Sequence, residues 1–183
     1  MARRIAYIGE PVLSLAQVAY QCRIEPEDME PELVEQIIIP GVTAQAESRT
    51  GAGIRQATYE EHWPAGFPAG HALDRGQVVE IDSVVLLNAD GSDSDQDVVF
   101  RLRKGGLEDY LDFPAGRPSG ALRIQYKAGT DLDVYPGVRS WMLMAAATAY
   151  KQRETLVLGQ TLFELPHSFL DHLLAEITVP PRF

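Results

Sequence analysis

The sequence has little cysteine, no long apolar run and few basic residues for its number of acids. Its single cysteine, Cys22, excludes a disulfide within the chain, so the fold does not require an oxidising compartment. No stretch approaches the roughly 18 consecutive apolar residues of a membrane-spanning helix, and the N-terminus has no apolar segment of signal-peptide length. We therefore expect a soluble protein that is made in the cytoplasm and does not enter a membrane.

The charge of the chain is strongly acidic. Lysine and arginine number 16 against 26 aspartates and glutamates, which gives a formal net charge of −10. Affinity for DNA comes largely from basic side chains that displace counterions from phosphates, so this balance argues against a protein that grips DNA. It does not exclude a protein through which DNA slides without sticking.

The sequence also lacks the common catalytic and metal-binding motifs. It contains no G-x-S-x-G, no G-x-x-x-x-G-K and no G-x-G-x-x-G. No pair of carboxylates can be recognised as a catalytic acid and base. Metal-ligand spacing is also missing from the four histidines, which are His62, His71, His167 and His172. We expect no enzyme, no cofactor and no metal, and an enzyme with an unrecognised site stays open as an alternative.

The stretch NADGSDSDQD, residues 88–97, raises the question of a calcium loop. A loop of the EF-hand type needs glycine at its sixth position and glutamate at its twelfth, and no reading frame of this stretch provides them. The flanking runs are β-like where that motif needs helices, and the stretch begins with a turn signature. We interpret it as the exposed acidic tip of a β hairpin, formed by Asp90, Asp93, Asp95 and Asp97.

Two helices are expected in the first part of the chain. Ser14 and Gln17 have the spacing of a capping box, followed by apolar residues at helical spacing, which predicts a short helix over about 14–23. A longer helix is expected from about residue 28 to Gly51, where glycine suits the C-terminal stop. Pro40-Gly41 lies in its middle and predicts a kink or a break there.

Two more helices are expected near the C-terminus, over about residues 135–177, and are followed by an extended tail, 178–183. The first carries two apolar stripes, one of Val138, Trp141, Met142, Ala145 and Ala149 and the other of Leu143, Ala146 and Tyr150. A helix that is apolar on two faces must be covered on two sides. We expect the core on one side and a neighbouring subunit on the other.

Between the helices, residues 55–128 have the texture of β strands. Short apolar runs separated by glycine, proline and aspartate are RQATYEEHW, QVVEI, SVVLL, DVVFRLR, LEDYLDF and ALRIQYKAG. We predict an α+β fold in a single domain, 1–183, with helices about 14–51 and 135–177 forming a small bundle. An antiparallel β hairpin or small sheet is inserted between them at about 55–128. Composition and spacing alone indicate an acidic, oligomeric domain of this class.

Four segments carry a resemblance to a known family: LSLAQVAYQCRI, ELVEQIIIPGVTAQAESRTG, YPGVRSWMLMAAATAYKQRET and LPHSFLDHLLAEITVPPRF. In order and texture they resemble the head-tail connector proteins, also called adaptor or head-completion proteins, of tailed bacteriophages. The resemblance covers about residues 13–63 and 121–183. Pro40-Gly41 departs from it, because the corresponding helix is usually continuous, and residues 63–120 match only loosely.

The resemblance implies a structural virion protein without enzymatic activity, made in the bacterial host cytoplasm. It implies a homo-oligomeric ring, usually dodecameric, on the portal protein, which joins the filled capsid to a neck, stopper or tail protein. Genomic DNA would pass through the bore without sequence-specific binding. Subunit contacts are expected at Trp141, Leu143, Ala146, Tyr150 and Arg153, and portal docking at Val179, Pro180, Pro181, Arg182 and Phe183.

Two other interpretations stay open. One is another neck or tail-completion protein of the same particle. The other, from a different class, is a small non-enzymatic binding module that presents the β insertion to a carbohydrate, an ion or a protein. In the connector interpretation, the acidic tip would face the bore or the next neck protein.

Overall fold

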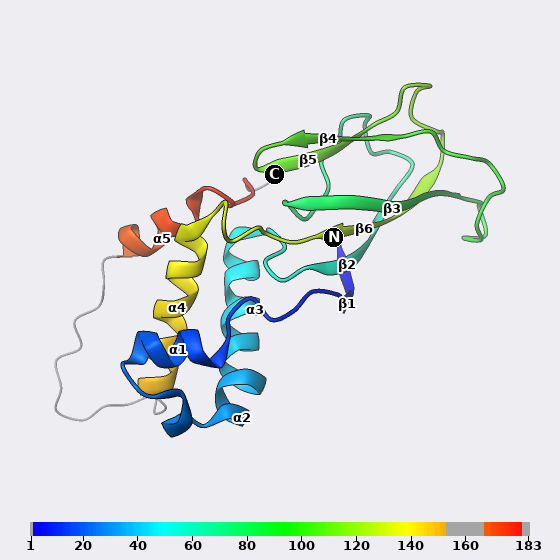
Figure 1. Ribbon diagram of the computed structural model, residues 1–183. Helices are drawn as coiled ribbons and strands as arrows, with labels where there is room; N and C mark the ends of the chain where they lie inside the picture. Colours follow the sequence, from blue (N-terminus) through cyan, green and yellow to red (C-terminus); the bar gives the residue numbers. More distant parts are fainter. Residues whose placement is uncertain (1, 153–166, 181–183) are drawn as a thin grey trace. The chain divides into compact units, whose positions relative to one another are not determined.

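The structure is a computed structural model that describes residues 2–152 and 167–180. The chain separates into two compact units (Figure 1). The β unit consists of Met1–Glu10, Gly51–Thr130 and Ile177–Phe183, and the helical unit consists of Pro11–Thr50 and Asp131–Glu176. Helices and antiparallel sheets are both present, which confirms the expected α+β class.

The first helix of the helical unit, α1, spans Leu15–Cys22 and begins at the predicted capping box. The backbone N–H of Gln17 donates to Ser14 Oγ at 3.3 Å, and the Ser14 N–H donates to Gln17 Oε1 at 2.9 Å. Arg23 ends the helix in the left-handed conformation, with its N–H directed at the carbonyls of Ala19 and Tyr20. Local signals thus fix both ends of α1.

A kink or a break was expected at Pro40-Gly41 in the second helical segment, and the structure has a wide turn just before this pair. The segment begins as α2, Pro31–Leu33, continues as a π-helical turn, Val34–Ile38, and then as α3, Ile39–Thr50. In α geometry the ring of Pro40 would clash with the carbonyl four residues earlier. The π turn relieves that clash just upstream, so α3 itself runs through Pro40 and ends, as predicted, at Gly51 with φ of +71°.

Helix α4, Pro136–Lys151, is the helix around which the helical unit packs. It begins with proline at its first turn, as predicted, and contacts α1, α3 and α5, His167–Ala175. Its buried side chains are Val138, Trp141, Met142, Ala146 and Ala147. Helix α4 therefore contributes to the core of this unit on more than one side, and Figure 1 shows it among the other helices.

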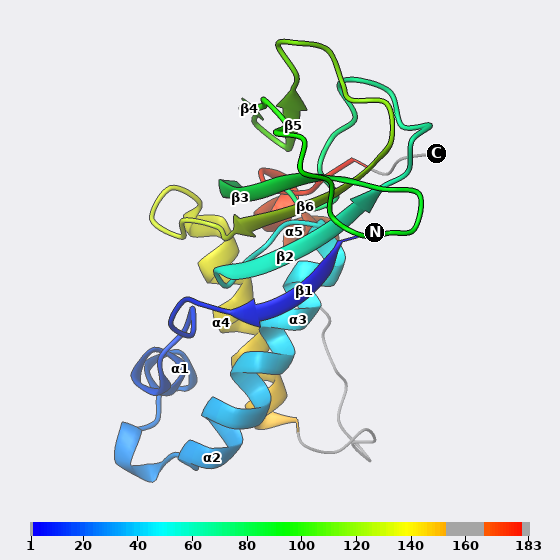
Figure 2. The ribbon, with the colours of Figure 1, turned by 90° about the vertical axis from the view of Figure 1, so that its right-hand side faces the viewer.

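The β unit contains a four-stranded antiparallel sheet with the order β1-β2-β6-β3 (Figure 2). Its strands are β1, Arg3–Tyr7, β2, Ala57–Trp63, β6, Ala121–Ala128, and β3, Val78–Leu87. The runs QVVEI and SVVLL form one strand, β3. Its pairing with β6 shifts register between Val78 and Glu80 and between Ile81 and Ser83. Strand β1 was not predicted, because its sequence shows no apolar alternation, and all of its residues except Tyr7 are exposed.

A second, two-stranded sheet is formed by β4, Arg101–Gly105, and β5, Glu108–Asp112. The core of the β unit lies on the buried face of the large sheet. It contains the fully buried aromatic and aliphatic side chains Tyr59, Trp63, Leu73, Leu111, Leu122, Ile124 and Tyr126. Leu122, Ile124 and Tyr126 point into this core, and the residues between them point to the other face of the sheet, which we call the wet face. This is the alternation that predicted β6.

The two ends of the β insertion are held side by side. Strands β2 and β6 pair without a register shift from Ala57↔Ala128 to Trp63↔Leu122. Beyond the strands, the Thr130 side chain donates to the Gly53 carbonyl at 2.7 Å, and its N–H donates to the Ile54 carbonyl at 3.2 Å. The chain therefore enters and leaves the insertion at neighbouring points.

Two helical glycines with opposite surroundings provide a matched test of this packing. Among the described residues, no atom lies within 4 Å of a Cβ added at Gly41, whereas one added at Gly137 would lie 2.9 Å from the Leu173 carbonyl oxygen. Gly41→Ala is expected to raise the free energy of unfolding by about 0.5–1 kcal/mol, because alanine loses less backbone entropy. Gly137→Ala is expected to lower it by about 1–3 kcal/mol, because α5 must shift. Urea unfolding of both variants measures this, and equal effects of the same sign would contradict it.

Candidate functional site

A buried carboxylate lies at the centre of the β unit. Glu61 is only 1% exposed, since it falls on the core face of β2. Its Oε1 accepts a hydrogen bond from Trp63 Nε1 at 2.6 Å. Its Oε2 accepts from the Asp74 N–H at 3.0 Å and from the Tyr126 hydroxyl at 3.1 Å. Glu61 therefore ties β2, β6 and the loop before β3 together.

Burial controls the protonation of this network. It raises the pKa of Glu61, and the nearby charge of Asp74 raises it further, against the effect of the three hydrogen-bond donors. Burial and the charge of Glu61 likewise hold the pKa of Tyr126 well above its ordinary value. The sequence stretch YEEHW contained a signal for this site, because strand alternation places Glu61 between Tyr59 and Trp63 on the buried face.

Glu61 also belongs to a group of three side chains that are close enough together to hold a metal ion. Glu61, His71 and Asp74 each offer a ligand atom, and these atoms lie within 4.8 Å of one another. Both Glu61 oxygens, however, already face protein donors, and the His71 ring packs edge-on against Trp63 with centroids 5.2 Å apart. The geometry is that of a structural network that anchors the loop between β2 and β3.

Adjacent glutamates on β2 are expected to give opposite pH dependence. The folded-state pKa of Glu61 is raised, so its contribution to stability is present at low pH and is lost as pH rises through that pKa. The pKa of Glu60 is lowered, first by the hydrogen bond from Gln125, so its contribution is present at neutral pH and is lost as pH falls. Urea unfolding midpoints are to be measured for the wild type and both variants between acidic and neutral pH. The midpoint of the wild type minus that of Glu61→Gln should decrease as pH rises. The midpoint of the wild type minus that of Glu60→Gln should increase. Parallel profiles would contradict the burial of Glu61.

The predicted acidic tip is a tight turn after β3. The Asn88 N–H donates to the Ser92 carbonyl at 2.8 Å, and Asp90 Oδ1 accepts from the Ser92 N–H and hydroxyl at 2.9 and 2.6 Å. Asp93 then bridges back to Leu87. The chain therefore turns back along the free side of β3, and the predicted tip aspartates are all exposed.

The strands on either side of this turn do not pair with each other. β3 pairs with β6 and β4 with β5, so the return arm beside β3 consists of the Asp93 bridge and the hydrogen bond from the Ser94 N–H to the Leu86 carbonyl at 2.8 Å. Asp93 Oδ2 also binds Arg123 Nη2 at 2.6 Å. The carboxylates of Asp90 and Asp93 are thus occupied by protein donors.

The residues expected at a subunit contact on α4 have different surroundings. Trp141 and Ala146 are buried within the chain itself, and the Trp141 ring lies 5.6 Å from the Arg49 guanidinium. Leu143 and Tyr150 are half-buried and keep accessible area, while Arg153 lies outside the described residues. The second apolar stripe is therefore not a separate face, because Ala146 belongs to the interior.

The expected portal-docking tail begins packed on its own chain. A Cβ added at Gly51 would lie 3.2 Å from Val179 Cβ, and one added at Gly76 would lie 2.8 Å from Val179 Cγ2. Val179 is half-buried on these two glycines and Pro180 is exposed. The remaining residues of the predicted docking set, Pro181, Arg182 and Phe183, lie outside the described part of the chain.

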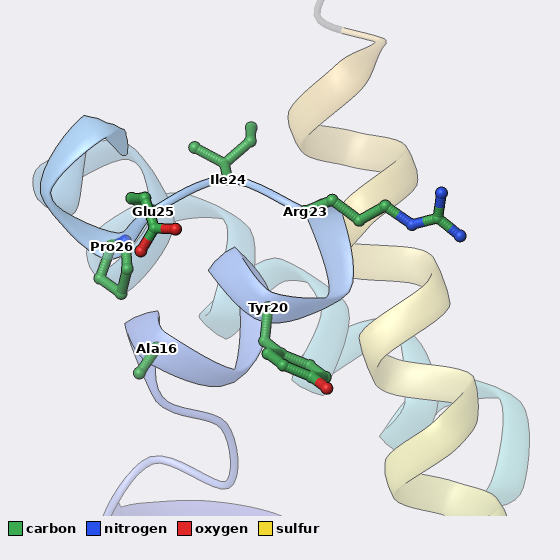
Figure 3. A pocket seen from close by; sticks show the side chains of 6 residues that line it. All are labelled: Ala16, Tyr20, Arg23, Ile24, Glu25 and Pro26. Atoms are coloured by element: carbon green, nitrogen blue, oxygen red, sulfur yellow. The ribbon is translucent and has the colours of Figure 1, made fainter.

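A groove of about 650 Å³ lies beside α1 in the helical unit, which the sequence did not predict (Figure 3). Ala16 and Tyr20 line it from α1, and Arg23, Ile24, Glu25 and Pro26 line it from the connection that follows. Tyr20 is 88% exposed although it is a large aromatic residue. Exposed aromatic residues of this kind commonly anchor protein contacts.

Two observations limit other kinds of site. Cys22 is buried, and burial raises the pKa of its thiol, so the reactive thiolate is disfavoured. Among the described residues, none of the helices has both the length and the apolarity needed to span a bilayer. The remaining candidate sites among the described residues therefore lie on exposed sheet edges, helix faces and loops.

Comparison with known proteins identifies the fold. No protein-family model matches the sequence, and no curated protein matches it. A chain from the virion of a native gene transfer agent particle is 14% identical, with a TM-score of 0.77, and the match covers 100% of this chain and 97% of that chain. A chain from the neck of an empty gene transfer agent particle, computed with C6 symmetry, is 14% identical with a TM-score of 0.73 and the same coverage.

A further chain, from the neck of a native gene transfer agent particle computed with C12 symmetry, is 16% identical with a TM-score of 0.67, again over 100% of this chain and 97% of that chain. At such identities the likeness concerns the fold. It extends over the whole chain, so it includes the β insertion, which the sequence resemblance covered only loosely. This chain therefore has the fold of chains found in the virion and neck of a phage-like particle.

Proposed function

We propose that this protein is a structural component of the neck of a phage-like particle, where it forms a ring between the DNA-filled head and the tail. The observation that carries the proposal is the full-length likeness to chains whose descriptions place them in a virion and in necks. Coverage of nearly the whole of both chains favours a shared role in assembly over a shared subdomain.

The symmetry of the necks to which the similar chains belong supports the ring. Those necks were computed with C6 and C12 symmetry, and a neck chain that obeys such symmetry is present in several copies around the DNA axis. Leu143 and Tyr150 on α4 and the groove beside Tyr20 provide accessible apolar area for contacts with other chains. The expected neighbours are the portal protein above and a neck, stopper or tail protein below.

The charge of the protein suits a channel for DNA. A net charge of −10 opposes adhesion to phosphates, so genomic DNA can pass without being held. The salt bridges on the wet face of the sheet also support weak adhesion to DNA. Lys127 is bound by Glu80 and Asp82 at 3.0 and 2.9 Å, and Arg123 is bound by Asp93. These two cations are thus already paired with carboxylates.

Deletion of the gene from the particle's own gene cluster tests the role. The expected result is DNA-filled heads and free tails that do not join, with joining restored by the gene in trans. Mass spectrometry of purified wild-type particles should find the chain in multiple copies. Normal tailed particles without the chain would contradict the proposal.

Removal of the last four residues tests the portal contact. Deleting residues 180–183 is expected to weaken binding to the portal protein in a pull-down, because an extended segment can order on a partner. The urea midpoint should stay unchanged, since Val179, which packs on Gly51 and Gly76, is retained. Unchanged portal binding by the truncated chain would remove the tail from the docking surface.

A further inference from the structure

The two edges of the four-stranded sheet carry opposite charges. One edge is β1, and the other is β3 with the chain that turns back beside it. Leu87 pairs with Ala121 on one side and with Asp93 on the other, so the returning chain lies at the outer margin of the sheet. We call residues 93–99 the acidic segment.

The β1 edge is basic, and among the described residues no further strand pairs with its outer side. The four residues from Arg3 to Ala6 are all exposed, although adjacent strand residues point to opposite faces of the sheet. Arg3 binds Glu60 at 3.0 Å with its side chain still 75% exposed. The guanidinium groups of Arg4 and Arg55 lie 4.1 and 4.6 Å from the centroid of the Tyr7 ring. Three guanidinium groups therefore gather at this edge in a chain whose net charge is −10.

The acidic segment presents the complementary pattern. Asp93, Asp95, Asp97 and Val99 are exposed, as is Gln96, while Val98 and Phe100 pack against the core of the β unit. In the described part of the chain, residues 95–100 belong to no strand. The segment is thus an acidic margin, and among the described residues no strand pairs with residues 95–99.

We propose that β1 of one copy lies along the acidic segment of the next copy, so that the sheets of neighbouring subunits join edge to edge around the ring. The inference rests on the proposed ring. Sheet edges with unpaired backbone groups are templates for another chain, and opposite charge favours basic edge against acidic edge. Pairing of β1 with a second β1 would place Arg3 and Arg4 of both copies together, so a two-fold contact is disfavoured.

Strand direction agrees with this arrangement. Each neighbouring pair in the order β1-β2-β6-β3 is antiparallel, and Asp93 pairs antiparallel with Leu87, so the acidic segment begins in the direction of β1. Successive copies in a many-membered ring differ by a small rotation, which makes the two segments nearly parallel. We choose the parallel register that places Arg3 opposite Asp97, and it brings the exposed Ile5 opposite the exposed Val99.

Cysteine cross-linking in assembled particles tests the contact. In particles that carry the Ile5→Cys/Val99→Cys chain, mild oxidation is expected to give a ladder of covalent multimers that a reducing agent removes, because a disulfide requires Cα atoms within about 7 Å. The matched control is Ile5→Cys/Val134→Cys, since Val134 and Val99 are both 62% exposed. The single-cysteine variants control for the buried Cys22.

Charge reversal provides the second measurement. The ladder is expected to be lost when Arg3→Glu/Arg4→Glu or Asp95→Lys/Asp97→Lys is added, and to return when all four changes are in one chain. Arg101→Glu/Lys104→Glu on β4 makes the same change in charge as the β1 reversal and is expected to leave the ladder intact.

The outcomes separate this inference from the proposed function. If the chain is present in the neck but Ile5→Cys/Val99→Cys gives no multimers, or if Ile5→Cys alone gives dimers, the edge-to-edge contact is wrong and the neck role stands. If the chain is absent from particles, the proposed function fails, and the contact fails with it.

Discussion

The pairing of β2 with β6 is the constraint on which the rest of the structure depends. It aligns Ala57 with Ala128 and Trp63 with Leu122, so a long insertion begins and ends at neighbouring points and the helices on both sides of it can form one unit. Glu61 reinforces the pairing from the buried side, because its carboxylate accepts hydrogen bonds from β2, from β6 and from the loop before β3. A buried carboxylate with several donors is costly to disrupt by removing one partner.

This pairing also determines where the sheet ends. With β2 and β6 at the centre, β1 and β3 become the margins, and the charges of the sequence are then separated in space. Arg3 and Arg4 lie at one margin, and the aspartates of the acidic segment lie at the other. A subunit whose margins differ in charge suits head-to-tail assembly, which closes into a ring, better than a symmetric pair.

Local signals predicted much of the helical unit, and non-local contacts explain what was missed. The capping box at Ser14, the stop at Gly51 and the proline start of α4 act within a few residues, so they can be identified from sequence. Strand β1 exists because a segment more than 50 residues away provides its ladder. The burial of Glu61 and the basic and acidic sheet margins likewise arise only once distant segments pair.

The central claim is that copies of this protein surround the DNA axis at the neck. Electron cryo-microscopy of the particle encoded by the same gene cluster tests it most directly. We predict density for this fold, repeated in a closed ring between head and tail, with the strands of adjacent copies meeting at their edges. A neck complete without this chain, or the chain located elsewhere in the particle, would contradict it.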